Sequence, residues 1–388
     1  MHLVFATSIV PCGAPQTGYE IANAAILDAL ARAGVRVTVL GFAWPGAAPA
    51  NPENTVVLGH VDVTTDGAPA MRKLRWLARA LLGGFTFSSA KLRVIGHGEL
   101  QTALAALEPV DGVIFNSVQF AGAFAWAFSG LPFLYIAHNV EHRSAEENAA
   151  ASPPLLRLLY RREARLLKAL EARLCADARF VFTLAEEDRA LLGVADDARS
   201  ATLPLVVGVA AAPDRERKPV FDAALIGTWT WAPNRIGLEW FLDKVVPRLP
   251  AGFSIAVAGR VPAGLAEAHP RVRFVGRVPE AAAFIRQARV VPLVSRAGTG
   301  VQLKTIETFE LGLPSVATSH SLRGIASIPE NCRRADAPEA FAEALQDMAA
   351  GGVPDLDGRT FHRAQRDALD RQLRRGLAVF GNACAEAA

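Results

Sequence analysis

Cysteine is scarce in this sequence, and the few cysteines form no regular pattern. The four are scattered and include no CxxC pair: Cys12, Cys175, Cys332 and Cys384. This spacing argues against a structural zinc site and against a disulfide framework, and it fits a reducing cytoplasm. The start of the chain, Met1–Ala6, lacks the basic region of a signal peptide and favours a first strand instead. We therefore expect a cytoplasmic protein.

An excess of charge of one sign is also lacking. Lys and Arg number 41 and Asp and Glu 38, which leaves a formal charge of +3. So mild a balance permits anionic small molecules or a membrane surface as partners, but it does not indicate nucleic acid. Because 51% of the 388 residues are apolar and 20% are charged, the chain has material for two hydrophobic cores and little sign of disorder.

Residues that bind metal ions are not grouped. The sequence has no DxD motif between its expected strands and no dense carboxylate cluster. Mg²⁺ and Mn²⁺ sites are built from such oxygen ligands. We therefore expect a functional site without a metal ion or another cofactor.

One long run, residues 112–137, has no charged residue and could cross a bilayer by its length. Polar residues, glycine and proline interrupt it at intervals: Asn116, Ser117, Gln119, Gly130 and Pro132. This pattern favours a buried strand over 112–115, a helix over 120–128 and a strand over 133–137.

Strands and helices alternate in two series. Leu3–Thr7, a helix over 19–33 that ends at Gly34, and Val35–Leu40 form a first βαβ unit, which is typical of a parallel sheet. The polar, proline-flanked residues 210–219 are typical of a linker, which we expect over 206–220. We expect an N-terminal domain over 1–205, a C-terminal domain over 221–358 and a final helix over 359–388 that packs on the N-terminal domain.

The C-terminal series predicts strands at 223–226, 254–258, 272–275, 290–294 and 315–317. In the N-terminal domain, a long amphipathic helix is predicted near 157–174, with leucines facing the core: Leu155, Leu159, Leu166, Leu170 and Leu174. A stripe of cations lies opposite them: Arg157, Arg161, Arg165 and Lys168. Together with the basic, leucine-rich segment 71–82, this stripe either docks on anionic lipid or forms an ordinary solvated face.

The most informative loop follows the expected strand 290–294. Gly298, Thr299 and Gly300 precede a helix predicted to begin near Val301 and end at Gly312. Free amides at a helix start, with no side chain on the glycines, suit a diphosphate. Lys304 can add a positive charge, and Glu307 can accept hydrogen bonds from ribose hydroxyls. The alternative is a plain helix start with a surface Lys–Glu pair.

The segment 298–318 resembles the donor-site signature of GT-B glycosyltransferases of family 4. Glu307 matches the second glutamate of their paired-glutamate motif, which binds the nucleotide ribose. The first glutamate, expected eight positions earlier, is replaced by Thr299. The chain resembles a branch in which a glycine-rich loop and a lysine stand in, so the resemblance makes Lys304 the leading diphosphate ligand.

Three further segments extend this resemblance. The segment 225–237, with its Pro-Asn pair, resembles the first strand and loop of the family's donor domain. This resemblance places Thr228 and Arg235 near the donor. Ile236 stands at a position where relatives carry a lysine. Segment 271–279 resembles the base-recognition strand and loop, with Arg277 and Val278. Arg260 follows strand 254–258 and is a further candidate near the phosphates. Trp229 and Trp231 fit packing or a platform for a base or sugar equally well.

The N-terminal half adds fewer candidates. Gly13 and Gly18 flank the loop that approaches the donor diphosphate in relatives, and their spacing is not that of a dinucleotide fingerprint. Residues 138–141, His-Asn-Val-Glu, resemble the HNVE segment of this branch, in which the histidine contacts the transferred sugar. His138 is therefore a catalytic candidate and Glu141 a weaker one.

The resemblance implies a GT-B architecture, with two Rossmann-like parallel-sheet domains facing a cleft. It implies transfer of a sugar, with retention of anomeric configuration, from a UDP- or GDP-type donor to a glycan, lipid-linked or small-molecule acceptor. His138, Arg235 and Lys304 are the expected catalytic group, in a protein that is cytoplasmic or peripheral at the inner membrane face. Two alternatives stay open: a nucleotide-sugar epimerase on the same fold, and a non-catalytic nucleotide- or sugar-binding protein.

Overall fold

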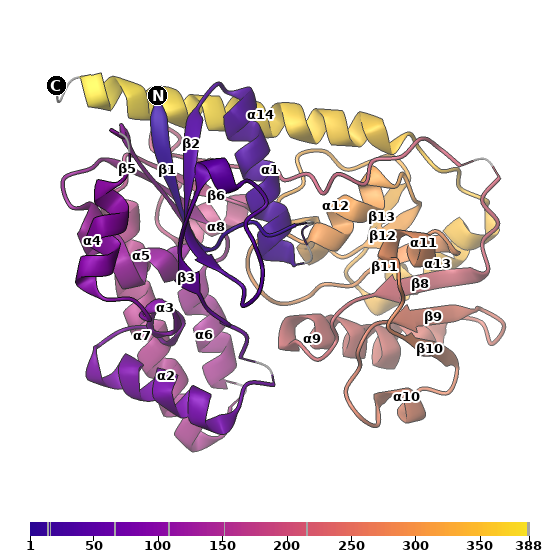
Figure 1. Cartoon of the computed structure of the whole chain (residues 1–388). Coiled ribbons are helices and arrows are strands. Elements are labelled where there is room, and N and C mark those ends of the chain that lie inside the picture. Colours follow the sequence, from indigo (N-terminus) through magenta and orange to yellow (C-terminus); the bar gives the residue numbers. More distant parts are fainter. Residues whose placement is uncertain are drawn as a thin grey trace. The chain divides into compact units, whose positions relative to one another are not determined.

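The computed structural model describes residues 1–385 except 14, 16, 66, 108, 151 and 215. Ala14 and Gln16 of the glycine loop, Arg215 of the expected linker and the side chain of Cys384 therefore lie outside the description. The chain divides into two compact units (Figure 1): residues 1–203 with 369–388, and residues 204–368.

The N-terminal unit is built on a parallel sheet in the order β3-β2-β1-β4-β5-β6-β7. Its strands are β1 (His2–Ile9), β2 (Arg36–Ala43), β3 (Thr55–His60), β4 (Gly112–Asn116), β5 (Phe133–Ala137), β6 (Phe180–Thr183) and β7 (Ser200–Thr202). β1 is buried along its whole length because helices cover both faces of a parallel sheet. The strand order reverses between β1 and β4, which makes this pair the switch point of the sheet.

The helices of this unit connect successive strands. They are α1 (Gly18–Arg32), α2 (Ala70–Leu82), α3 (Phe87–Leu92), α4 (His97–Ala105), α5 (Val118–Phe124), α6 (Glu141–Ala150), α7 (Pro154–Asp177) and α8 (Glu186–Leu191), with a 3₁₀ turn at Pro52–Asn54. The uncharged run 112–137 forms β4, α5, a 3₁₀ turn (Ala125–Phe128) and β5, which confirms the buried arrangement. No helix in the described part of the chain is long and apolar enough to span a membrane.

The C-terminal unit has a second parallel sheet in the order β10-β9-β8-β11-β12-β13. Its strands are β8 (Phe221–Ile226), β9 (Ile255–Ala258), β10 (Val272–Gly276), β11 (Ala288–Leu293), β12 (Ser315–Ala317) and β13 (Cys332–Arg334). Its helices are α9 (Ala232–Trp240), α10 (Leu265–Ala268), α11 (Ala281–Ile285), α12 (Leu303–Glu310) and α13 (Pro338–Ala350), with short π and 3₁₀ turns at Phe241–Val245, Val246–Arg248 and Ser319–Leu322. The order reverses between β8 and β11. Both sheets are therefore Rossmann-like.

The last helix, α14 (Gly358–Ala385), begins in the C-terminal unit, and its residues from Leu369 onward belong to the N-terminal unit. There Asp370 accepts hydrogen bonds from Arg32 on α1, and Phe380 is fully buried. At the other end, His362 of α14 is hydrogen-bonded to Glu310 of α12.

Several expected boundaries are wrong by a few residues. α12 begins at Leu303 rather than near Val301, and α7 runs from Pro154 to Asp177 rather than over 157–174. The expectation that Leu155 faces the core is also wrong, because this side chain is 77% exposed in the first turn of α7. In contrast, Gly34 has a φ of 73° directly after the C-cap of α1, as a helix-ending glycine requires.

Candidate functional site

The switch point of the C-terminal sheet brings two loops together. The loop after β8 begins at Gly227, and the loop after β11 contains residues 294–302 and leads into α12. In open parallel sheets the crevice at such a reversal, at the carboxyl ends of the strands, is the usual place for a ligand. A pocket in this region is lined by residues from both loops, the start of α9 and α12: Trp229, Asn234, Ser295, Gln302, Lys304, Thr305 and Glu307 among them.

Lys304 lies in the first turn of α12, and its ammonium is placed over the loop after β8. The Nζ atom lies 4.7 Å from the centre of the Trp229 ring, a cation–π contact. A Cβ atom on Gly227 would lie 2.6 Å from this Nζ, so the glycine leaves the room that the lysine uses. Burial lowers the pKa of Lys304 to about 8, and Glu307 opposes that shift. No carboxylate of the described chain forms an ion pair with Lys304.

Trp229 has a structural role as well. It is buried, and its indole Nε1 donates to the carbonyl of Ala258 at 2.8 Å. This side chain therefore packs in the core and also presents a ring to Lys304, whereas Trp231 is exposed. Of the two readings open for Trp229, packing is confirmed, and the cation–π contact with Lys304 is an addition that the sequence did not predict.

The glycine-containing loop reaches α12 through two unusual backbone positions. Gly298 and Gly300 have φ values of 93° and 77°, a region that glycine adopts without strain. The carbonyl of Gly300 accepts a hydrogen bond from Nε of Arg323, a buried arginine in the loop that follows Ser319–Leu322. Gln302, the N-cap of α12, forms no side-chain capping bond. The first amides of α12 are therefore not capped by a side chain at this position.

Glu307 lies one turn after Lys304 on α12 and lines the same pocket. It is half-buried, and burial raises the pKa of its carboxyl group, while the nearby Lys304 ammonium lowers it. A carboxylate beside a positive charge in a partly desolvated pocket can accept hydrogen bonds from hydroxyl groups.

The remaining candidates of this unit lie along the same edge of the sheet but are more exposed. Thr228 follows β8, Arg260 follows β9, and Arg277 with Val278 follows β10. Arg235 in α9 forms a long ion pair with Glu239, at 3.7 Å, and both side chains are nearly half exposed. Arg235 thus already has a carboxylate partner and is more exposed to solvent, whereas Lys304 has no ion pair among the described residues and is half-buried. Val301 and Thr299 lie in the loop just before α12.

In the N-terminal unit, His138 belongs to a buried polar network at the switch point between β1 and β4. Its Nε2 lies 2.8 Å from Oδ1 of Asn116, at the end of β4. The amide nitrogen of Asn116 donates to Oδ1 of Asn23 at 2.7 Å and to the Tyr19 hydroxyl at 3.2 Å. That hydroxyl lies 2.7 Å from Oγ1 of Thr7 on β1. Because Asn116 Oδ1 can only accept, Nε2 of His138 carries a proton in this arrangement.

This environment keeps the imidazole neutral. Burial lowers the pKa of His138 to about 4, and the Tyr19 ring lies against it with a centroid distance of 4.9 Å. The residue after Asn116 is strained: Ser117 has φ 73° and ψ 164°, and it alone among the described non-glycine residues has a positive φ. Such conformations cluster at functional sites, because the surrounding structure must impose them.

Glu141 begins α6 beside this network. Its carboxylate accepts from the Gln119 amide at 3.3 Å and lies near the buried Glu171. Burial and the Glu171 charge raise the pKa of Glu141 to about 7. Glu171 itself accepts hydrogen bonds from the main-chain amides of Glu141 and His142 and pairs with the His142 ring at 2.7 Å. It thus fixes the start of α6.

The glycine loop of the N-terminal unit leads into α1, and the start of this helix is capped, unlike that of α12. Gly13 has a φ of 73° and Gly18 begins α1, but here a capping box closes the helix start. The Thr17 hydroxyl accepts from the amide of Glu20, and the Glu20 carboxylate accepts from the amide of Thr17 at 2.9 Å. A negative charge therefore already lies at this helix start, unlike at α12.

Asn116, Asn23, Tyr19 and Thr7 were not among the expected site residues. Asn116 is a polar residue at the end of an apolar strand, which is a weak signal that could have indicated it. The other three become part of the network only when β1, α1 and β4 lie side by side. The described residues contain no group of three or more His, Cys, Asp or Glu side chains able to hold a metal ion.

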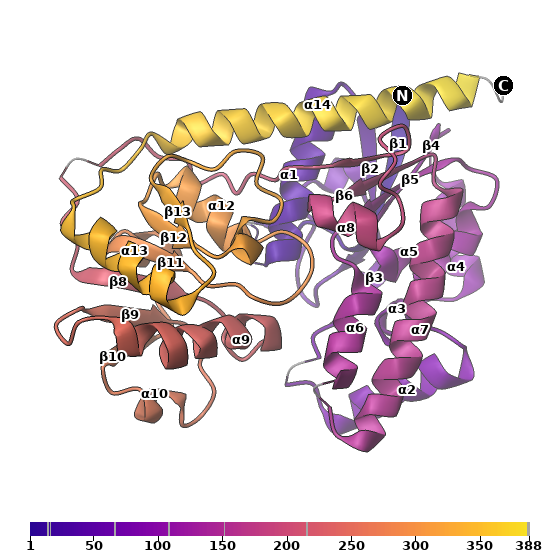
Figure 2. The same ribbon diagram turned by 180° about the vertical axis from the view of Figure 1, so that it is seen from behind.

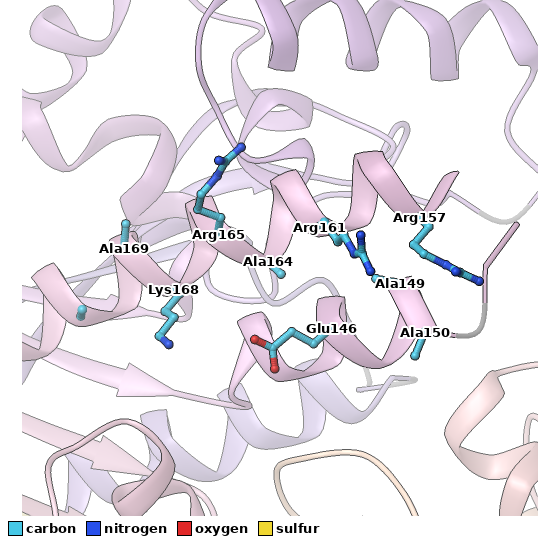
Figure 3. A pocket seen from close by; sticks show the side chains of 10 residues that line it. Glu146, Ala149, Ala150, Arg157, Arg161, Ala164, Arg165, Lys168 and Ala169 are labelled. Atoms are coloured by element: carbon cyan, nitrogen blue, oxygen red, sulfur yellow. The ribbon is translucent and has the colours of Figure 1, made fainter. Parts of the chain in front are cut away.

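A separate groove of about 760 Å³ lies between α6 and α7 (Figure 3). Its lining includes the cationic stripe of α7, Arg157, Arg161, Arg165 and Lys168, and the exposed carboxylate of Glu146. Glu146 is paired with Arg143 at 2.9 Å. The stripe therefore keeps its positive charge on this face of the unit.

Comparisons with known proteins are consistent with this geometry. Residues 222–350 match the family model described as Glycosyl transferases group 1. No protein of curated function matches the chain by sequence. Among solved structures, the sucrose-phosphate synthase of Thermosynechococcus elongatus is similar with a TM-score of 0.65 at 16% identity, covering 97% of this chain and 96% of that one.

Two further structures share the fold along the whole chain. Anabaena HepE in complex with UDP-glucose has a TM-score of 0.58 at 13% identity, with 99% and 100% of the two chains covered. The catalytic domain of starch synthase IV from Arabidopsis thaliana, bound to ADP and acarbose, has a TM-score of 0.57 at 11% identity, with 99% of each chain covered. At these identities the likeness establishes the two-sheet GT-B fold.

Proposed function

We propose that this chain, whose residues 222–350 match the Glycosyl transferases group 1 model, is a glycosyltransferase with a donor site in that segment. In this proposal the C-terminal unit binds a nucleoside diphosphate sugar at the switch point between β8 and β11. Lys304 and the start of α12 bind the diphosphate, and Glu307 binds the ribose. The similar fold of HepE with UDP-glucose supports a UDP-type donor, and a GDP-type donor is the alternative.

The observation that carries the proposal is the setting of Lys304. Its ammonium is half-buried and contacts an aromatic face, and no carboxylate of the described chain forms an ion pair with it. A cation without an ion pair in a partly desolvated pocket costs free energy even with the Glu307 carboxylate nearby, and an anionic ligand recovers it. The start of α12, without a side-chain cap, adds main-chain donors directed to the same ligand.

The same charges explain how the site would accelerate transfer. Cleavage of the bond from the anomeric carbon to the diphosphate leaves negative charge on the phosphate oxygens. Preorganised donors and a cation at that position stabilise the developing charge. Lys304 and the α12 amides meet this need without a metal ion, with Arg235 as a secondary cation. We therefore propose a metal-independent reaction.

The other candidates have secondary roles in the proposal. The exposed loops with Arg260, Arg277 and Val278 contact the base and the outer phosphate. His138, held as a neutral imidazole by Asn116, contacts the hydroxyls of the transferred sugar as a hydrogen-bonding group. Transfer proceeds with retention, to a glycan, lipid-linked or small-molecule acceptor.

Ligand-dependent stabilisation tests the donor site. A ligand that binds only the folded chain raises its unfolding temperature, so a panel of UDP and GDP sugars should identify the donor. The Lys304→Ala variant should bind that donor roughly 10- to 100-fold more weakly, as expected for loss of one charge-assisted hydrogen bond. Lys218→Ala, which removes an exposed lysine of the same unit, is the matched control and should bind normally. Unchanged donor affinity and turnover in Lys304→Ala would refute the assignment.

The two alternatives predict different products. An epimerase converts the donor sugar without any acceptor, and a binding protein neither hydrolyses nor transfers it. Incubation of the identified donor with a mixture of acceptors, followed by NMR of the product anomeric centre, separates these outcomes and tests retention. Full activity after treatment with a chelator is expected, and its loss would contradict metal independence.

A further inference from the structure

The N-terminal unit carries an apolar surface that faces solvent on α2. Met71, Leu74, Ala78, Leu81 and Leu82 follow one another at helical spacing, opposite the buried face formed by Trp76 and Ala80. Leu82 is 90% exposed and Met71 64%. A helix of a soluble domain normally turns such a stripe inward, so an outward stripe marks a contact surface.

The first turns of α7 continue this surface. Leu155, Leu156 and Leu158 are exposed there, Leu155 by 77% and Leu158 by 62%. Arg162 of α7 donates to the carbonyl of Ala80 on α2 at 2.8 Å and to that of Phe85 at 3.2 Å. Figures 1 and 2 both show the start of α7 beside α2. The exposed leucines of the two helices therefore lie on neighbouring elements of the same unit, and we call the two sets together the leucine surface.

The charges within the leucine surface have one sign. Residues 70–82 contain four Lys or Arg and residues 154–162 contain three, and neither segment contains an Asp or Glu. Lys73, Arg75 and Arg161 are exposed among the leucines. The cationic stripe of α7 extends this charge through Arg165 to Lys168, about 16 Å along the helix from Arg157.

We propose that the leucine surface docks the protein on the anionic phospholipid surface of a membrane. Exposed leucines on a basic amphipathic helix insert among the acyl chains, while the lysines and arginines contact lipid phosphates. A second copy of the chain would meet the same positive charge and be repelled, so charge complementarity favours the lipid. No spanning helix is needed for this contact.

Co-sedimentation of the full chain with vesicles tests the proposal. The protein is expected to bind vesicles of phosphatidylcholine mixed with phosphatidylglycerol, to bind phosphatidylcholine alone much less, and to lose binding as salt screens the charges. A protein that stays in solution with the mixed vesicles at low salt overturns the proposal.

Two double variants separate the apolar and the charged contributions. Leu82→Gln with Leu155→Gln should weaken vesicle binding about tenfold or more. Arg75→Gln with Arg161→Gln should weaken it roughly 30-fold, since each cation near an anionic surface contributes about fivefold. Val220→Gln, and Lys218→Gln with Arg334→Gln, remove matched exposed side chains from the C-terminal unit and should leave binding unchanged. Equal binding by all these variants contradicts the surface named here.

Self-association is the competing outcome. Light scattering could find a dimer that dissociates in the Leu82→Gln with Leu155→Gln variant, while the wild type does not bind vesicles. The leucine surface would then join two copies of the chain, and the proposal would be overturned. This test of membrane binding does not depend on the donor site, because thermal stabilisation by the nucleotide sugar can be measured separately in each variant tested with vesicles. Normal stabilisation with lost vesicle binding separates the two proposals.

Discussion

The ammonium of Lys304 lies 4.7 Å from the ring centre of Trp229, two residues that are 75 positions apart in the chain. The ring contact and the partial burial place a positive charge in the pocket between β8 and β11, where burial lowers the pKa of Lys304 to about 8. We therefore expect the affinity for the donor to depend on pH through the ionisation of Lys304.

Donor affinity should be constant below about pH 7 and fall above about pH 8. Of the two forms of Lys304, only the charged ammonium attracts the diphosphate, so each pH unit above the pKa of Lys304 reduces affinity by up to about tenfold. The measurement is the dissociation constant of the nucleotide sugar by calorimetry between pH 6 and pH 10. Lys304→Arg keeps its charge over this range and should flatten the profile. The same fall with pH in Lys304→Arg would assign the dependence to another group.

The contact between His138 and Asn116 predicts the ionisation of the histidine. His138 should be neutral at neutral pH and become half protonated only near pH 4, because burial disfavours the imidazolium. Asn116→Asp places a carboxylate at the ring nitrogen and should raise this pKa, since the carboxylate stabilises the charged form. NMR of histidine carbons, with the exposed His60 as reference ring, measures both values. An ordinary pKa for His138 in the wild type would mean that the ring is solvated.

Sequence reasoning succeeded where local pattern determines structure. Apolar runs predicted the strands β1, β8 and β12, and Gly34 predicted the end of α1. The loop around Gly298 was singled out because glycines and a lysine stand directly after a strand. The start of α12 was misplaced by two residues because Val301 and Gln302 stay outside the helix, and nothing in their types distinguishes them from helix formers.

Long-range contacts were beyond the sequence. The network of Thr7, Tyr19, Asn116 and His138 joins residues of β1, α1 and β4 to the residue that follows β5, and only the strand order places them together. The exposure of Leu155 was missed for a related reason. Leucines lie on more than one face of the first turns of α7, so periodicity alone does not tell which of them the core covers.

Ser117 offers a test of backbone strain beside this network. Its φ of 73° with ψ of 164° costs a non-glycine residue about 1–3 kcal/mol, whereas glycine adopts this conformation without strain. Ser117→Gly should therefore be at least as stable as the wild type, although it loses the hydroxyl bond to Gln119. Ser117→Ala keeps the strain, loses that bond and should be about 1 kcal/mol less stable. Denaturant titration ranks the three, and a glycine variant less stable than the alanine variant would show that no strain is stored there.

The carboxylate of Glu310 stabilises residues 207–209, the segment that enters the C-terminal unit. Its buried carboxylate accepts hydrogen bonds from the amides of Val207, Gly208 and Val209 at 2.8–2.9 Å and from the His362 ring at 2.9 Å. Glu310→Gln replaces one acceptor oxygen by a donor that faces other donors, so the unfolding free energy should fall by about 3 kcal/mol. His362→Ala removes one contact of the four and should cost about 1–2 kcal/mol. The exposed Glu343→Gln is the charge control and should be neutral. Denaturant midpoints in which His362→Ala loses as much as Glu310→Gln would place the stabilisation in the ring rather than in the three amides.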